Sequence, residues 1–236
     1  MARPPRYDGL ADWYDQEIGG LEVTTTAVTA LGRLVGDGPG TCLDLGCGTG
    51  IAIPALLERG WRVVGVDLSA DQLRVARRRA DAPDVALVAA DAAALPFADG
   101  SFDAVVSVLT HTDFDHPEAA FAEAARVLRR GGRFSYVGIH PCFVSPFVER
   151  HPTGTHRLHP GYRLRGWHHS GPGFGEGSAP ASASTICPWP TWSAWSWGPG
   201  SPSCGWRSRV TTTTRFSSLC SCNAEPADVG SGLSRS

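Results

Sequence analysis

Three glycines that alternate with other residues mark the part of this sequence with the clearest chemical use. Gly46, Gly48 and Gly50 directly follow a short apolar run that contains Asp44. The run predicts a buried strand, and the glycines predict a turn whose backbone adopts positive φ and lets a ligand lie against bare main chain. Residues 51–59 predict a helix with unpaired N–H groups in its first turn. We therefore expect a small, partly anionic ligand at this turn.

A second apolar run, residues 61–67, also ends in an acid, Asp67. A carboxylate at this place after a glycine turn can accept hydrogen bonds from both hydroxyls of a ribose. The turn does not fit the dinucleotide fingerprint G-x-G-x-x-G, because Ile51 stands where the third glycine would be. These positions favour a nucleoside ligand that is not a dinucleotide.

Two further runs follow at compact spacing. Residues 85–91 end in Asp91 and precede Leu-Pro-Phe at 95–97, and residues 102–107 end at Ser107. Each run alone carries little information. Four runs in this order predict that the ends of neighbouring strands build one binding site.

The segment Asp44-Leu45-Gly46-Cys47-Gly48-Thr49-Gly50 resembles the first motif of the class I S-adenosylmethionine-dependent methyltransferases, and the three later runs resemble further motifs of that family. The resemblance implies S-adenosylmethionine as cofactor, with Asp44 near its amino group, Asp67 on its ribose and Asp91 beside its adenine. Residues 7–15 resemble a helix that covers the cofactor in many members, although their spacing also fits simple packing on the core. The cofactor-binding residues that the resemblance implies are Tyr14, Asp44, Gly46, Cys47, Gly48, Gly50, Asp67, Leu68, Asp91, Ala92 and Ser107.

Methyl transfer from a sulfonium is an in-line displacement, so the protein has chiefly to align donor and acceptor and to exclude water. A base tuned near neutral pH helps where the acceptor is a hydroxyl or an acidic carbon. His111 follows the fourth predicted strand and His140 the fifth, so both are candidate catalytic bases, and a hydrogen-bonded structural histidine is the alternative for each. Residues 108–111 carry no Asn-Pro-Pro-Tyr, which disfavours methylation of nucleic acid and favours a small-molecule acceptor.

Composition and the N-terminal sequence predict a cytoplasmic protein. Its 236 residues suffice for one α/β domain, and its net charge of −2 offers no basic field for nucleic acid or for an anionic membrane. No signal peptide or membrane span is evident, so the cysteines are expected to be reduced and mostly buried. Five histidines between 151 and 169 match no standard ligand spacing, and no metal site is predicted. The oligomeric state cannot be predicted.

Strands that alternate with helices through residue 139 predict a Rossmann-like, doubly wound α/β fold with a mostly parallel sheet. Ligands bind beyond the carboxyl ends of such strands, where the glycine turn and the acids fall. We divide the chain into an N-terminal helical cap (1–36), a cofactor-binding core (37–141), an irregular lid or substrate loop (142–177) and an irregular tail (178–236).

The tail differs in composition from the rest of the chain. Its 59 residues hold five of the eight tryptophans, four of the seven cysteines and only two acids, Glu225 and Asp228. A frame set one nucleotide earlier permits a helix and two strands here, which are the elements that the sheet would otherwise lack. We therefore interpret the tail as a frameshift product and expect an incomplete sheet with an exposed fifth strand. An inactive or cofactor-binding-only domain is the alternative function, followed by an NAD-dependent oxidoreductase.

Overall fold

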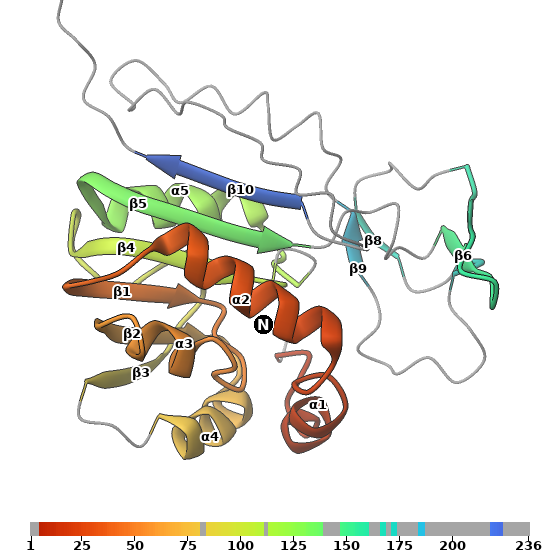
Figure 1. The fold of residues 1–236 in the computed structure, drawn as a ribbon, viewed down its shortest axis with the longest axis horizontal. Coiled ribbons are helices and arrows are strands. Elements are labelled where there is room, and N and C mark those ends of the chain that lie inside the picture. The colour runs from red at the N-terminus through yellow and green to blue at the C-terminus, as the bar shows by residue number, and fades with distance from the viewer. Residues whose placement is uncertain are drawn as a thin grey trace, which may run out of the picture.

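The computed structural model describes residues 5–80, 84–110, 113–138, 147–160, 166–168, 171–173, 184–186 and 218–223. A six-stranded sheet in the order β10-β5-β4-β1-β2-β3 forms its centre (Figure 1). Strands β1 to β5 are parallel to one another, and β10 at the edge of the sheet is antiparallel to β5. The strands are β1 (Gly40–Leu45), β2 (Trp61–Asp67), β3 (Val85–Ala89), β4 (Phe102–Val108), β5 (Leu128–Gly138) and β10 (Ser218–Asn223).

Helices cover both faces of this sheet. Figure 1 shows α2 and α3 on one face and α5 on the other. Ala104 and Val106 of β4 join the apolar cluster under α2 and α3, whereas Val105 joins the cluster under α5. Because both faces of the sheet centre are buried, the central strands β1 and β4 are mostly apolar in sequence. The helices are α1 (Ala11–Glu17), α2 (Glu22–Val35), α3 (Ile53–Leu57), α4 (Ala70–Arg79) and α5 (Pro117–Val127).

This architecture confirms the predicted fold class and several local signals. Strand β2 has the predicted bounds, and Ser69 caps α4 by accepting a hydrogen bond from the Gln72 N–H at 3.2 Å. The pair Gly131-Gly132 predicts the end of α5 from sequence, and this prediction is wrong. The helix stops at Val127, because Leu128 is already extended and pairs with Phe102 of β4.

The expectation for the chain after residue 141 also needs correction. The segment expected to be irregular contains the hairpin β6 (Val148–Arg150) and β7 (His156–Leu158), and β8 (Gly166–His168) pairs with β9 (Ser184–Ile186). The fifth strand is not exposed as predicted, because β10 pairs with residues 133–138 of β5 along its whole length. Main-chain pairing needs no apolar periodicity, which explains why the sequence pattern missed β10.

Two further expectations concern thiols and membranes. Cys42 and Cys47 are buried free thiols, as predicted, whereas Cys142 lies outside the described residues. In the part of the chain that the structure describes, no helix combines the length and the apolar character that a membrane crossing would need.

Candidate cofactor-binding site

The glycine turn lies at the carboxyl ends of β1 and β2. Gly46, Gly48 and Gly50 have φ values of 72°, 53° and 75°, which favour glycine. The N–H groups of Gly46 and Cys47 donate to the Val66 carbonyl at 2.8 and 2.9 Å, so the turn stays attached to β2. A Cβ on Gly46 would lie 2.7 Å from a side-chain carbon of Thr110. Positive φ therefore favours glycine at all three positions of the predicted turn, and at Gly46 the lack of space for a side chain also requires it.

Asp67 fastens this turn to the start of α4. Its Oδ2 accepts a hydrogen bond from the Gly48 N–H at 2.9 Å, and its Oδ1 accepts one from the Ser69 N–H at 2.9 Å. Burial raises the pKa of Asp67, and the backbone N–H donors of Ser69 and Gly48 oppose that rise. The Asp67 carboxylate thus holds the glycine turn in place and also lines the cavity.

Asp44 lies beneath the turn and is fully buried. Neither of its carboxylate oxygens has a hydrogen-bond partner among the described residues. Burial, and then the charge of Asp67, raise the pKa of Asp44 to about 7. A buried carboxyl group without donors is costly, so this position is suited to a group that brings positive charge or hydrogen-bond donors nearby.

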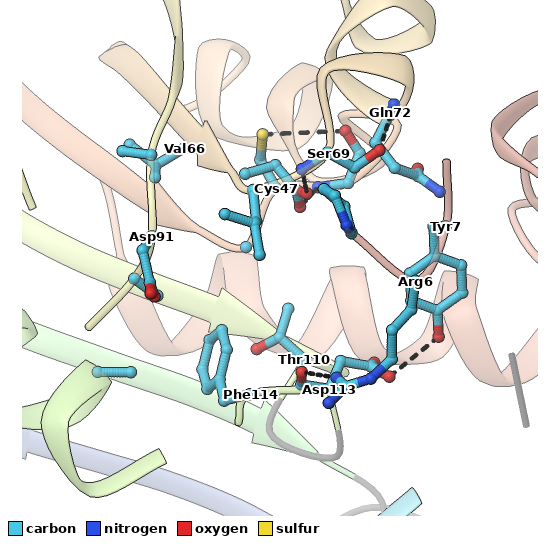
Figure 2. Close-up of a pocket in the computed structure, with 18 of the residues that line it drawn as sticks. Arg6, Tyr7, Cys47, Val66, Ser69, Gln72, Asp91, Thr110, Asp113 and Phe114 are labelled. Carbon is cyan, nitrogen blue, oxygen red and sulfur yellow. Dashed lines mark hydrogen bonds between the residues drawn. The ribbon is translucent and has the colours of Figure 1, made fainter. Parts of the chain in front are cut away.

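A cavity opens in front of the turn, and Figure 2 shows the side chains around it. It brings together the predicted residues Tyr14, Gly46, Cys47, Gly48, Asp67, Leu68, Asp91 and Ala92. Asp44, Gly50 and Ser107 do not lie on the cavity wall as the described residues form it. Ser107 is buried instead and shares a hydrogen bond with Thr110.

The charge of the cavity wall is mainly negative. Four carboxylates, those of Asp67, Asp91, Asp113 and Asp115, line it, and Arg6 is the one arginine among the described lining residues. Arg6 itself contacts Asp115 and the Asp113 carbonyl. Such a wall favours a ligand that carries positive charge.

The N-terminal segment forms one side of the cavity. The Tyr7 hydroxyl donates to Asp113 Oδ1 at 3.0 Å, and the rings of Tyr7 and Tyr14 meet edge to face at 5.2 Å between centroids (Figure 2 labels Tyr7). Burial raises the pKa of both tyrosine hydroxyls, so both stay protonated. Helix α1 therefore lies where a covering helix was expected.

The two predicted catalytic bases, His111 and His140, lie outside the described residues. Between them in sequence, His116 lines the cavity at the start of α5. Leu109, which directly follows β4 and also lines the cavity, has a φ of 58°. This conformation is strained for a branched side chain, and such strain concentrates at functional sites.

Sequence reasoning missed two side chains at the site. The run of arginines at 77–79 predicts a solvated helix end, but the Arg79 guanidinium donates to the Thr49 carbonyl at 3.1 Å and contacts Asp15 of α1. No local pattern could reveal this contact, because it joins distant segments. Gln72 interrupts the buried face of α4, and a polar residue at that place was a signal that could have been used.

Comparison with known proteins identifies the core. Residues 43–136 match the sequence model of a family described as methyltransferase domain. This segment is a methyltransferase domain. A demethylmenaquinone methyltransferase of Renibacterium salmoninarum is 36% identical over 148 residues, which cover 60% of each chain. A demethylmenaquinone methyltransferase of Thermus thermophilus is 43% identical over 107 residues, which cover 44% of this chain and 49% of the relative.

The chain thus spans 60% and 49% of the lengths of these two relatives. Among solved structures, an S-adenosylmethionine dependent methyltransferase from Mesorhizobium loti superposes with a TM-score of 0.65, with 86% of this chain and 98% of that chain covered. At 20% identity this match establishes the Rossmann-like fold. S-adenosylmethionine is the cofactor that the methyltransferase domain indicates.

Proposed function

We propose that this chain binds S-adenosylmethionine and transfers its methyl group to an O, N or C atom of a small-molecule acceptor. The observation that carries the proposal is the negative wall of the cavity in front of the glycine turn. S-adenosylmethionine brings a sulfonium and an ammonium group, which this wall attracts. A dinucleotide brings a diphosphate, which the carboxylates of Asp67, Asp91, Asp113 and Asp115 would repel.

The described residues suit the parts of this cofactor. Asp67 would hold the ribose, and Leu68, which is 50% exposed on the cavity wall, would pack against the adenine together with Ala92. Asp91 would face the adenine amine, and the buried carboxyl group of Asp44 beneath the glycine turn would be the acidic group nearest to the α-ammonium. Tyr14, Gly46, Cys47 and Gly48, which line the cavity, would make the remaining contacts with the cofactor, whereas Gly50 and Ser107 lie off the cavity wall.

When bound, S-adenosylmethionine supplies a methyl group on a positively charged sulfur. The chain then has to position the acceptor in line with that bond and keep water out, and α1 with Tyr7 and Tyr14 provides cover. His111 and His140 are proposed to take the acceptor's proton where the acceptor is a hydroxyl or an acidic carbon.

The relatives supply the first acceptors to test. Two of them are named demethylmenaquinone methyltransferases, and a third relative, from Mycolicibacterium smegmatis, is named fatty-acid O-methyltransferase. We propose a demethylated quinone as the first acceptor and a fatty acid as the second.

Equilibrium dialysis with S-adenosylmethionine and with NAD tests the proposal. We expect binding of S-adenosylmethionine and weak or no binding of NAD, and the reverse would overturn the assignment. Transfer of a labelled methyl group to the two acceptors then tests turnover. Binding without turnover on a broad acceptor panel would favour the cofactor-binding-only alternative, which the unusual composition of residues 178–236 supports.

A further inference from the structure

Gln72 is a polar residue on the buried face of α4. Its exposed fraction is 2%, and the other buried residues of this helix are Leu73, Val75 and Ala76. An apolar side chain at this place would extend the packing of its neighbours. A glutamine instead loses the hydration of its amide, which needs replacement by hydrogen bonds.

Gln72 is among the residues that line the cavity, and Figure 2 shows its side chain. Its backbone N–H is held by the Ser69 hydroxyl, so the first turn of α4 is fixed. Its Oε1 has no hydrogen-bond partner among the residues that the structure describes. The same oxygen would lie 3.6 Å from a Cβ on Gly48, so the amide faces the glycine turn.

Gln72 and Asp67 both approach Gly48. Asp67 accepts a hydrogen bond from the Gly48 N–H, and the Gln72 Oε1 would lie 3.6 Å from a Cβ on the same residue. A ligand group that Asp67 holds next to Gly48 would therefore come near the Gln72 amide. A carboxylate only accepts hydrogen bonds, whereas an amide donates and accepts, and a half-turn about its last torsion exchanges O and N. This combination matches a sugar hydroxyl, which itself donates and accepts.

We propose that the Gln72 amide hydrogen-bonds a ribose hydroxyl of the bound cofactor beside Asp67, and so positions the nucleoside. The inference rests on the proposed function, because it takes an adenosine-containing ligand as the occupant of the cavity.

Isothermal titration of the full chain with three ligands tests it: S-adenosylhomocysteine, 5′-methylthioadenosine, which lacks the amino-acid part, and the 2′,3′-dideoxy analogue of S-adenosylhomocysteine. The variant is Gln72→Met, which keeps the length of the side chain and removes the amide. The control is Gln16→Met, which makes the same change at the chain's other glutamine, an exposed residue of α1. We expect Gln72→Met to weaken the first two ligands by a similar factor of about 3 to 10 and to leave the dideoxy analogue unchanged.

An equal loss for the dideoxy analogue would show that Gln72 acts only through packing, and would overturn the proposal. A loss confined to S-adenosylhomocysteine would assign Gln72 to the amino-acid part instead, and would also overturn it. Failure of the wild-type chain to bind any of the three ligands would instead count against the proposed function.

A spectroscopic readout keeps the test valid if Gln72→Met does not fold. Since the chain has two glutamines, labelling with ¹⁵N-glutamine gives two side-chain amide signals, which Gln16→Met assigns. We expect the Gln72 signal to shift with 5′-methylthioadenosine and not with its 2′,3′-dideoxy analogue. Equal shifts with both ligands would overturn the proposal.

Discussion

Asp67 shows how one side chain can serve both the ligand and the protein. Its oxygens accept two backbone N–H groups, and each oxygen keeps a second lone pair for a ribose hydroxyl. From sequence alone, a substitution here would be expected to leave the fold intact. The contacts to Gly48 and Ser69 indicate that the turn loosens as well.

We predict that Asp67→Ala weakens S-adenosylmethionine binding by about 1.5–3 kcal/mol, the range for a hydrogen bond to a charged group. It also leaves two N–H groups without their acceptor, so the free energy of unfolding falls. Calorimetry and urea unfolding measure the two effects. Asp37→Ala is the control, since that carboxylate is exposed and pairs only with Arg59 among its described contacts. Unchanged cofactor affinity in Asp67→Ala would refute the ribose assignment.

The buried Asp44 predicts a dependence of stability on pH. Its pKa is about 7 in the folded protein and 3.8 ordinarily. Below about pH 4 both states hold the proton, and its contribution to stability is complete. Between about pH 4 and 7 the unfolded chain ionises while the folded chain keeps the proton, so this contribution is lost as the pH rises.

We therefore expect Asp44→Asn to gain stability relative to the wild type as the pH rises from about 4.5 to 7.5. Urea unfolding of both proteins at the two pH values measures the difference in their free energies of unfolding. The other carboxylates are the same in both proteins, so their titration cancels in this difference. A constant difference across this range would mean that Asp44 titrates normally in the folded state.

At the scale of elements, Arg79 joins three parts of the site. It extends from the last turn of α4 to Thr49 in the glycine turn and to Asp15 in α1. Arg78, the residue before it, pairs with Asp12 and is 63% exposed. Adjacent arginines thus provide a matched pair of test positions.

We predict that Arg79→Ala lowers the free energy of unfolding by about 1–2 kcal/mol, because the Thr49 carbonyl loses its charged donor. Amide exchange in α1 becomes faster in the same variant. Arg78→Ala is expected to change both quantities much less, since a single exposed ion pair contributes little. Equal behaviour of the two variants would show that the contact to Thr49 does not hold the turn.

The sequence was sufficient where the signal is local. The strand β2 and the cap at Ser69 follow from runs and caps that a few neighbouring residues define. The end of α5 was missed because pairing of Leu128 with Phe102, a distant partner, decides it. The contact between Arg79 and Thr49 could not be predicted for the same reason, because it joins residues that are distant in sequence. The ends of β1, β2 and β3 could be assigned to one site because parallel strands share an edge.

At the scale of the whole molecule, the tail raises the question of its reading frame. An earlier frame permits Val-Leu-Val-Ala-Val-Leu-Val at residues 216–222, and the structure places β10 at 218–223. Both readings therefore have a strand at nearly the same residues, and the present one pairs with β5. The permitted strand is more apolar than the present Ser-Leu-Cys-Ser-Cys-Asn.

We predict that sequencing of the gene reveals this frame from about residue 178, and that the restored chain is more soluble and unfolds more cooperatively. Sedimentation and thermal unfolding of the two chains measure the change. The interpretation fails if the DNA permits no such frame. It also fails if the present tail resists proteolysis as well as the core does.

Exposed ion pairs attach α1, the helix that covers the cavity, to α4, and this attachment affects ligand release. Asp12 pairs with Arg74 and Arg78, whose side chains are 45% and 63% exposed, so water and dissolved ions reach these contacts. Such pairs weaken as ionic strength rises, whereas the apolar clusters beneath the sheet do not. Salt would therefore loosen the covering helix before it loosens the core. Release of S-adenosylhomocysteine, the cofactor product, would then be faster in concentrated salt, while the rate of the methyl-transfer step itself stays the same.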